Sequence, residues 1–217
     1  MLDTRFPRVP GDIGHPASFA FPVRQAVVSG ASPERVVRGC EARLLQPFID
    51  AGRGLVAQGA RAIATSCGFL VLFQRELQDA LPVPVWTSSL LLLPELPVPA
   101  GVITIDAQSL GPEHLAAAGA DPHTPVEGVA RGCSLQRSLL DNLATLDETQ
   151  AARDVVAAAR RLIERCPEVR AIVLECTNMP PYAAAVHAAT GLPVHDIRSF
   201  LNSRWQRLAA VHDESPA

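Results

Sequence analysis

Two stretches of similar sequence decide the fold: RAIATSCGFLVLFQRELQDALPVPVW at residues 61–86 and RAIVLECTNMPPYAAAVHAATGLPVHDI at residues 170–197. Both begin with Arg-Ala-Ile, both contain one cysteine, and both continue through a helical pattern to Leu-Pro-Val. The two cysteines, Cys67 and Cys176, lie 109 residues apart, as do the two arginines that begin the stretches. Self-similarity of this kind indicates a duplicated structural unit.

Each copy predicts the order strand, cysteine, helix, strand. Residues 62–65 and 171–174 are short apolar runs, which are typical of buried parallel strands. A helix running from Ser32 and Pro33 towards Gly59 precedes the first copy, and a helix over residues 147–165 precedes the second. Further strands are predicted at residues 5–9, 25–28, 101–105 and 126–130. Alternating strands and helices imply parallel sheets.

The proline-rich segment at residues 94–99 is the natural boundary between the two copies. We therefore expect an α/β fold of two pseudo-symmetric lobes, each a parallel sheet flanked by helices, with the active site in the cleft between them. Residues 1–98 would form the first lobe and residues 99–198 the second. Residues 199–217 would pack back on the first lobe.

The composition favours a soluble protein with a sizeable core. Apolar residues make up 48% of the chain and charged residues 19%, and the net charge of −3 provides no basic patch for nucleic acid or an anionic membrane. Prolines interrupt the most apolar region, residues 81–105, and the N-terminus lacks the pattern of an export signal. The odd number of cysteines, five, argues against a disulfide framework. We expect a cytoplasmic protein whose partner is a small carboxylate. Whether the chain forms a homo-oligomer stays open.

The chain contains no lysine, since all 19 basic residues are arginine. A pyridoxal phosphate enzyme needs a lysine for its Schiff base, and a Walker A phosphate loop needs one as well. The sequence also lacks the spacing of a zinc site, a strand–G-x-G-x-x-G–helix unit and a G-x-S-x-G elbow. The expected chemistry therefore uses no cofactor and no metal.

Cys67 and Cys176 each follow a predicted strand, and ligands of parallel α/β sheets bind beyond the carboxyl ends of the strands. A helix N-terminus after each cysteine would lower the pKa of its thiol. Two thiols on opposite walls of one cleft could remove a proton from one face of a carbon and deliver one to the other. We interpret Cys40, Cys133 and Cys166 as small apolar residues.

The sequences around both cysteines resemble the aspartate/glutamate racemase superfamily: T-S-C-G-F-L at residues 65–70 and E-C-T-N-M-P-P-Y at residues 175–182. G-D-I-G-H-P at residues 11–16 and G-V-I-T-I-D-A at residues 101–107 extend the resemblance over nearly the whole chain. It implies a two-lobed fold and cofactor-free catalysis by the two thiols. Gly68 and Phe69 replace the Asn-Thr of the first motif of glutamate racemases, and Asn178 replaces the His of the second, which counts against glutamate as substrate.

The expected function is a racemase, an isomerase that acts at the α-carbon of an amino acid or related small carboxylic acid, with Cys67 and Cys176 as acid and base. The alternatives are a maleate-type cis–trans isomerase or an arylmalonate-type decarboxylase of the same superfamily, and, from another class, a carboxylate-binding protein without catalysis. The residues expected to bind the substrate carboxylate, together with backbone N–H groups, are His15, Ser66, Gly68, Thr104, Thr177 and Asn178.

Overall fold

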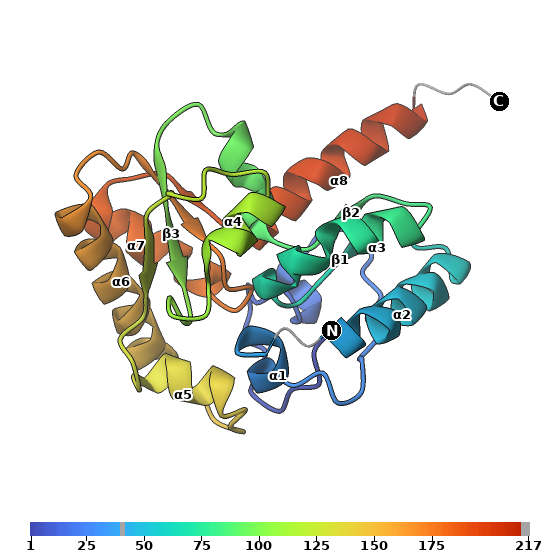
Figure 1. Ribbon diagram of the computed structural model, residues 1–217, viewed down its shortest axis with the longest axis horizontal. Coiled ribbons are helices and arrows are strands. Elements are labelled where there is room, and N and C mark those ends of the chain that lie inside the picture. Colours follow the sequence, from blue (N-terminus) through green and yellow to red (C-terminus); the bar gives the residue numbers. More distant parts are fainter. Residues whose placement is uncertain (40–41, 214–217) are drawn as a thin grey trace.

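The computed structural model describes residues 1–39 and 42–213 (Figure 1). The strands form two sheets, and every pair of neighbouring strands is parallel. One sheet pairs β1 (Ile63–Ala64) with β2 (Val85–Trp86). The other has the order β4-β3-β5-β6, with bounds β3 Ala100–Thr104, β4 Val126–Gly128, β5 Ala171–Leu174 and β6 Val194–His195. The predicted α/β fold with parallel sheets is confirmed.

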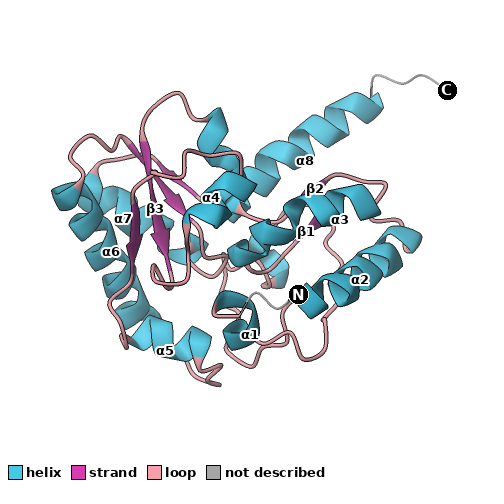
Figure 2. Cartoon of the chain, in the orientation of Figure 1, coloured by secondary structure: helices cyan, strands magenta, loops and turns pink. Residues whose placement is uncertain are grey.

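Helices flank the larger sheet, and α3 (Gln74–Ala80) packs beside β2 (Figure 2). The α-helices are α1 (Pro33–Val37), α2 (Leu45–Ala57), α3 (Gln74–Ala80), α4 (Pro112–Ala117), α5 (Ser134–Leu140), α6 (Glu148–Arg165), α7 (Ala183–Thr190) and α8 (Ile197–Asp213). Short 3₁₀ helices are η1 (Pro16–Ser18), η2 (Ala42–Leu44), η3 (Gly68–Phe73), η4 (Ser89–Glu95) and η5 (Pro180–Tyr182). Helix α6 packs on β3 and β4, whereas η4 packs on β5, so the larger sheet is flanked by helices.

The helix α6 shows how the sequence builds one of these layers. Asp147 caps its N-terminus by accepting a hydrogen bond from the N–H of Gln150 at 2.9 Å. Its buried residues, which include Ala151, Val155 and Leu162, recur at helical spacing and face the sheet. A Cβ at Gly101 on β3 would lie 2.6 Å from a methyl carbon of Leu162, so the close approach of α6 to the sheet requires glycine there.

The predicted helix towards Gly59 is wrong as a single element. Helix α1 ends at Val37, where the N–H of Arg38 donates to the carbonyl of Glu34, and the chain becomes helical again only at η2 and α2. Gly39, a poor helix former, follows this end. Residues 40–41 lie outside the described part of the chain, and the prediction for Cys40 lies there with them.

Two of the four further strands form. Residues 101–105 and 126–130 contain most of β3 and all of β4, but residues 5–9 and 25–28 contain no regular strand. The second of these segments is attached to the start of the chain, because the N–H of Val28 donates to the carbonyl of Met1 at 3.0 Å. A single local pairing of this kind does not extend into a ladder.

Helix α8 contacts elements that come early in the sequence. It packs on η4, and the ring of Trp205 stacks on Phe21 with centroids 4.8 Å apart. The guanidinium of Arg61 donates to the carbonyl of Leu208 at 3.0 Å. In Figure 1 the far end of α8 projects past β2 and α3. Residues 214–217 lie outside the description, and the division into residues 1–98 with 199–217 and residues 99–198 stays a prediction.

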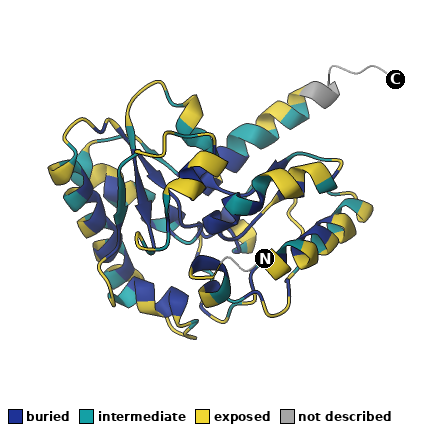
Figure 3. Ribbon diagram, in the orientation of Figure 1, coloured by how far each residue is buried: buried dark blue, intermediate teal, exposed yellow. Residues whose placement is uncertain are grey.

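One large core joins the two sheets. Its buried residues come from α1, η3, β3, β5, α5 and α6, and they include both Cys67 and Cys176. Figure 3 shows this buried region running through the centre of the molecule, with exposed residues on the outer helices. Within the described part of the chain, no helix combines the length and the apolar content needed to cross a membrane.

Candidate active site

Cys67 and Cys176 line the same small cavity at the ends of β1 and β5. Both side chains are buried, each with 8% of its surface exposed. The chain forms a tight turn after each cysteine: the carbonyl of Cys67 accepts from the N–H of Leu70 at 3.2 Å, and that of Cys176 from the N–H of Met179 at 3.0 Å. The structure therefore brings together two thiols that are far apart in the sequence.

The segments after the cysteines differ from the expected α-helices. Cys67 is the N-cap residue of the 3₁₀ helix η3, and α3 begins only at Gln74. Cys176 precedes η5, and α7 begins at Ala183. Short 3₁₀ segments are common at the starts of α-helices, and the missing N–H groups of Pro180 and Pro181 favour such a start. The lowering of the thiol pKa by an α-helix N-terminus therefore has no structural basis here.

The cavity is small, with a volume of about 30 Å³. Its polar lining consists of Ser66, Cys67, Gly68, Glu175, Cys176, Thr177 and Asn178. The apolar lining comes from the N-terminal segment, α1, η3, α5 and the end of β3: Leu2, Phe6, Pro33, Val37, Phe69, Ile105, Leu139 and Leu140.

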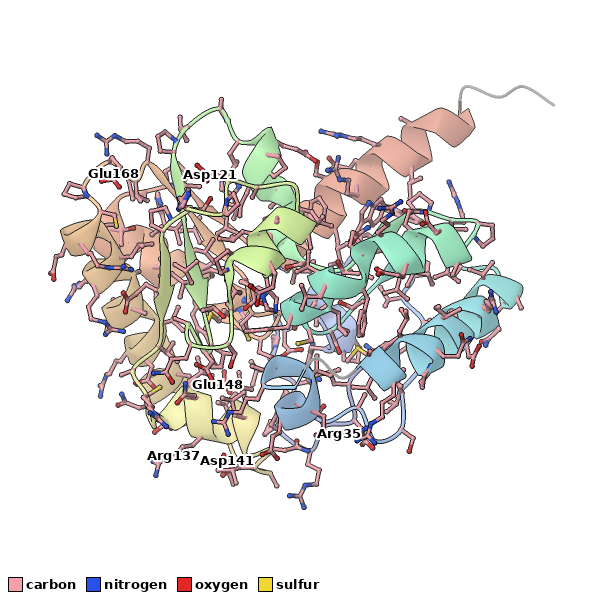
Figure 4. The ribbon with its side chains drawn as sticks, viewed as in Figure 1. Arg35, Asp121, Arg137, Asp141, Glu148 and Glu168 are labelled. Atoms are coloured by element: carbon pink, nitrogen blue, oxygen red, sulfur yellow. The ribbon has the colours of Figure 1, made fainter. Side chains whose placement is uncertain are left out.

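Helices α1 and α5, which contact each other, form one wall of the cavity. Helix α5 contributes the buried residues Leu139 and Leu140 to the lining, while Arg137 and Asp141 lie at the outer edge of the molecule (Figure 4). Arg35 on α1 lies along the same edge (Figure 4). The wall is thus one apolar layer of two short helices with a charged, solvated exterior.

Hydrogen bonds connect the two halves of the chain around the thiols. The hydroxyl of Thr177 donates to the carbonyl of Ser66 at 2.7 Å, and the hydroxyl of Ser89 donates to the carbonyl of Leu174 at 2.7 Å. The N–H of Leu2 donates to the hydroxyl oxygen of Ser66 at 2.8 Å. These bonds fix the position of the Cys176 turn relative to the Cys67 turn.

A chain of polar contacts starts at Cys176. Its thiol donates to Oδ1 of Asn178 at 3.7 Å, and the Asn178 amide donates in turn to the carboxylate of Asp12. Asp12, which is buried, forms a salt bridge with Arg8 at 3.1 Å. The charge of Asp12 is therefore compensated by Arg8, and Asn178 is held in a defined orientation beside Cys176.

Sequence reasoning missed Glu175, which lies fully buried between β5 and Cys176 and lines the cavity. The hydroxyl of Thr104 donates to its Oε2 at 2.7 Å. Burial raises the pKa of Glu175 to about 7, an effect that the Thr104 hydrogen bond partly opposes. The signal in the sequence was the acidic residue that ends the apolar run Ala-Ile-Val-Leu directly before Cys176.

The environment of Cys176 opposes ionisation of its thiol. Burial, followed by the negative charge of Glu175, raises the pKa of Cys176 well above its ordinary value, and the backbone N–H of Asn178 only partly offsets this. Nearby Tyr182 has a buried hydroxyl without a hydrogen-bond partner among the described residues. Burial, with the charge of Glu148 as the next cause, raises the pKa of Tyr182 as well.

The remaining predicted site residues lie at different distances from the thiols. Ser66, Gly68, Thr177 and Asn178 line the cavity. Thr104 is buried and reaches the site only through Glu175. His15 is the N-cap residue of η1, where its Nδ1 accepts from the N–H of Ala17 at 3.1 Å, and it is not among the residues that line the cavity. Their roles in binding stay predictions.

Two other cysteines occupy helix ends. Cys133 is the N-cap residue of α5, where its sulfur accepts from the N–H of Gln136 at 3.5 Å, and Cys166 is the C-cap residue of α6. Neither lines the cavity with the two thiols. Among the residues that the structure describes, no group of three or more His, Cys, Asp or Glu side chains is placed to hold a metal ion.

A larger cavity of about 360 Å³ lies beside β1. It is bounded by residues 19–26, β1 and α8, and its lining includes Phe21, Trp86 and Trp205. None of the cysteines of the described chain lines it, and Arg24 and Arg61 are its charged members. Neither of the two paired thiols reaches this cavity, so size alone does not make it the candidate active site.

By sequence, this chain is similar to dimethylsulfoniopropionate lyases. The chain is 33% identical over 218 residues to a dimethylsulfoniopropionate lyase from Durusdinium sp. clade D, an alignment that covers 90% of this chain and 69% of that protein. It is 33% identical over 235 residues to dimethylsulfoniopropionate lyase 7 from Emiliania huxleyi (strain CCMP1516), covering 98% of this chain and 66% of the relative. No protein-family model matches the chain.

Comparison with solved structures supports the fold. Unliganded arylmalonate decarboxylase superposes with a TM-score of 0.57 at 18% identity, covering 88% of this chain and 83% of the other. Glutamate racemase from Thermus thermophilus superposes with a TM-score of 0.52 at 19% identity, covering 87% of this chain and 68% of the other. The predicted fold of the aspartate/glutamate racemase superfamily is confirmed.

The expected racemase or isomerase activity is wrong. The relatives at 33% identity are named lyases, and their alignments cover at least 90% of this chain. The racemase and decarboxylase structures are similar in fold, but at 18–19% identity they carry no information about the reaction. The motifs around Cys67 and Cys176 thus identified the superfamily fold correctly and the reaction class incorrectly.

Proposed function

This chain belongs to the dimethylsulfoniopropionate lyase family, and we propose that it cleaves dimethylsulfoniopropionate to dimethyl sulfide and acrylate. The observation that carries the proposal is the 33% identity to the Durusdinium lyase over 90% of this chain. The chain spans about two thirds of the length of the first two relatives, 69% and 66%. The cavity with two thiols supports the proposal, because this cleavage requires a base.

The reaction is a β-elimination. A base removes a proton from the carbon next to the substrate carboxylate, and the C–H electrons form the new carbon–carbon double bond. The bond between the β-carbon and the sulfonium sulfur breaks, and its electron pair leaves with sulfur as neutral dimethyl sulfide. The products are acrylate, dimethyl sulfide and one proton, which the base receives. Unlike stereochemical inversion, this reaction needs a single base, because the leaving group requires no proton.

We assign the base to Cys67 because the environment of Cys176 keeps that thiol protonated. The pKa of Cys176 is raised by burial and by Glu175, and its proton is directed at Asn178. Cys67 lines the same cavity from the opposite half of the chain. In its thiolate form Cys67 removes the α-proton, while the neutral thiol of Cys176 packs against the reacting carbons.

The substrate carboxylate fits the polar side of the cavity. Ser66 accepts the N–H of Leu2, so its own hydroxyl proton is available to a carboxylate oxygen. The Asn178 amide has two N–H donors and uses one for Asp12. The hydroxyl proton of Thr177 is already engaged with the carbonyl of Ser66, which makes Thr177 a positioning residue. We therefore assign carboxylate binding to Ser66 and Asn178.

Release of dimethyl sulfide from added dimethylsulfoniopropionate tests the proposal by gas chromatography of the headspace. The purified wild-type protein should release it, and Cys67→Ser should release it about 10²–10⁴-fold more slowly, as is typical for loss of a general base. Cys176→Ser should lose less activity, and Cys166→Ser, a change at the far end of α6, should match the wild type. No release by a folded wild-type protein would refute the function, and an active Cys67→Ser would refute the assigned base.

A further inference from the structure

Glu175 is a buried carboxyl group without a compensating cation. Its side chain is 0% exposed, Oε2 accepts one hydrogen bond from Thr104, and Oε1 has no hydrogen-bond partner among the described residues. Within the described part of the chain, none of the salt bridges involves Glu175, whereas buried Asp12 is paired with Arg8. Ionising a buried carboxyl group whose second oxygen accepts no hydrogen bond is costly, so the group either binds a proton or is stabilised as a carboxylate by a positive ligand.

Glu175 also contributes the formal negative charge to the cavity lining. The other lining residues are the two cysteines, uncharged polar residues and apolar residues, and none is Arg or His. The apolar side includes Phe6, Phe69, Ile105 and Leu140. A carboxylate beside aromatic and aliphatic side chains complements a cation that is covered by methyl groups, because the methyl groups need an apolar wall and the charge needs a counter-ion.

The backbone opposite the carboxyl group is adapted to it. A Cβ at Gly68 would lie 2.2 Å from Oε1 of Glu175 and 2.6 Å from its carbonyl oxygen. Any other residue at position 68 would push the carboxyl group aside, so glycine next to Cys67 leaves room for the acid. Two residues that flank the catalytic thiols, Gly68 and Glu175, therefore depend on each other.

We propose that Glu175 is the counter-ion for the dimethylsulfonium group of the substrate. The proposal rests on the proposed function, since it assigns the second charged end of the same molecule. The substrate carboxylate would accept hydrogen bonds from Ser66 and Asn178, and the sulfonium group would lie beside Glu175. The α-carbon, between these two ends, would lie next to the sulfur of Cys67. An amino acid that lacks a positive β-substituent would leave Glu175 without its partner.

This role has a kinetic signature. The positive charge on sulfur disappears as the carbon–sulfur bond breaks, so Glu175 stabilises the bound substrate more than the transition state. Glu175→Gln should therefore raise KM by about tenfold or more while kcat stays within about twofold or rises. A merely structural role for Glu175 would lower kcat together with the amount of folded protein. Glu164→Gln, the same change at an exposed position of α6, should leave both parameters unchanged.

A binding experiment tests the charge directly and requires no turnover. The probes are 3-(trimethylammonio)propionate and 4,4-dimethylpentanoate, which have the same shape and differ by one positive charge. Isothermal titration calorimetry should show that the wild-type protein binds the charged probe at least about tenfold more tightly than the neutral probe. Glu175→Gln should abolish that preference: its affinity for the charged probe should fall, while its affinity for the neutral probe should stay within about threefold of the wild-type value.

Each outcome of this experiment has a defined meaning. Equal affinity of the wild-type protein for the two probes would overturn the counter-ion role even if Glu175→Gln fails to fold. A preference that survives in a folded Glu175→Gln variant would overturn it as well. Absence of dimethyl sulfide release by the wild-type protein would instead refute the proposed function, so the two failures are distinguishable.

Discussion

Replacing Glu175 with glutamine removes an ionisable group from the core and should change how the stability of the protein depends on pH. Burial raises the pKa of Glu175 from 4.5 to about 7 in the folded protein. Between these two values the folded chain binds a proton at Glu175 that the unfolded chain has lost. The free energy of unfolding therefore falls as pH rises through this range and levels off above about pH 7.

The magnitude follows from the size of the pKa change. One unit is worth about 1.4 kcal/mol, so the wild-type protein should lose about 2–3 kcal/mol of stability between pH 5 and pH 8 through this group. Glutamine is neutral throughout and loses nothing. Cys176 does not contribute in this range, because the pKa of its thiol is raised above its ordinary value.

Urea unfolding of both proteins at pH 5 and pH 8 measures the effect. The free energy of unfolding of Glu175→Gln minus that of the wild type should increase by about 2–3 kcal/mol from the lower to the higher pH. Glu164→Gln on the exposed face of α6 is the matched control and should follow the wild type at both values. Parallel behaviour of Glu175→Gln and the wild type would show that Glu175 has an ordinary pKa, and the reasoning from burial would be wrong.

Three further predictions concern packing, the link between the halves, and metals. Gly68→Ala should lower the free energy of unfolding by about 1–3 kcal/mol, because the new Cβ would clash with Glu175. Gly54→Ala should raise it by about 0.5–1 kcal/mol, because a Cβ there would have no atom within 4 Å. A higher melting temperature for Gly68→Ala than for Gly54→Ala would contradict this. Thr177→Val should lower the free energy of unfolding by about 1–2 kcal/mol and slow dimethyl sulfide release, because the hydrogen bond to the carbonyl of Ser66 is lost. Thr177→Ser should restore both stability and rate. A Thr177→Val variant with wild-type stability and rate would show that this hydrogen bond is not needed. Exhaustive chelation should leave turnover unchanged, and loss of activity that a divalent ion restores would reveal a metal requirement.

The repeat around Cys67 and Cys176 was enough to predict parallel sheets and a thiol at the end of a strand in each half. Duplication preserves the order of elements, and the apolar run of β5 is readable as a buried strand without further information. The prediction of a single helix from Pro33 to Gly59 was wrong. The apolar periodicity of the sequence continues past Arg38, although the helix itself ends there at its C-cap. An acidic residue at the end of an apolar run marked Glu175, but its burial could not be predicted, because its partners Thr104 and Gly68 come from distant parts of the sequence.

The reaction class could not be read from the two cysteines. Racemisation and β-elimination both begin when a thiolate removes the proton next to a carboxylate. They differ in what happens at the neighbouring carbon, where elimination requires a leaving group that belongs to the substrate. The difference in the protein lies in how the cavity accommodates that group, and here the informative residue is Glu175 rather than Cys67 or Cys176.

The most direct test follows dimethylsulfoniopropionate by proton NMR in D₂O with purified wild-type protein. The elimination mechanism predicts that acrylate signals appear as substrate signals disappear, one molecule for each substrate consumed, with an equal amount of dimethyl sulfide in the headspace. Deuterium entering the α-position of the substrate without any acrylate would contradict it. That result would mean that the thiols of this cavity exchange a proton and leave the carbon–sulfur bond intact.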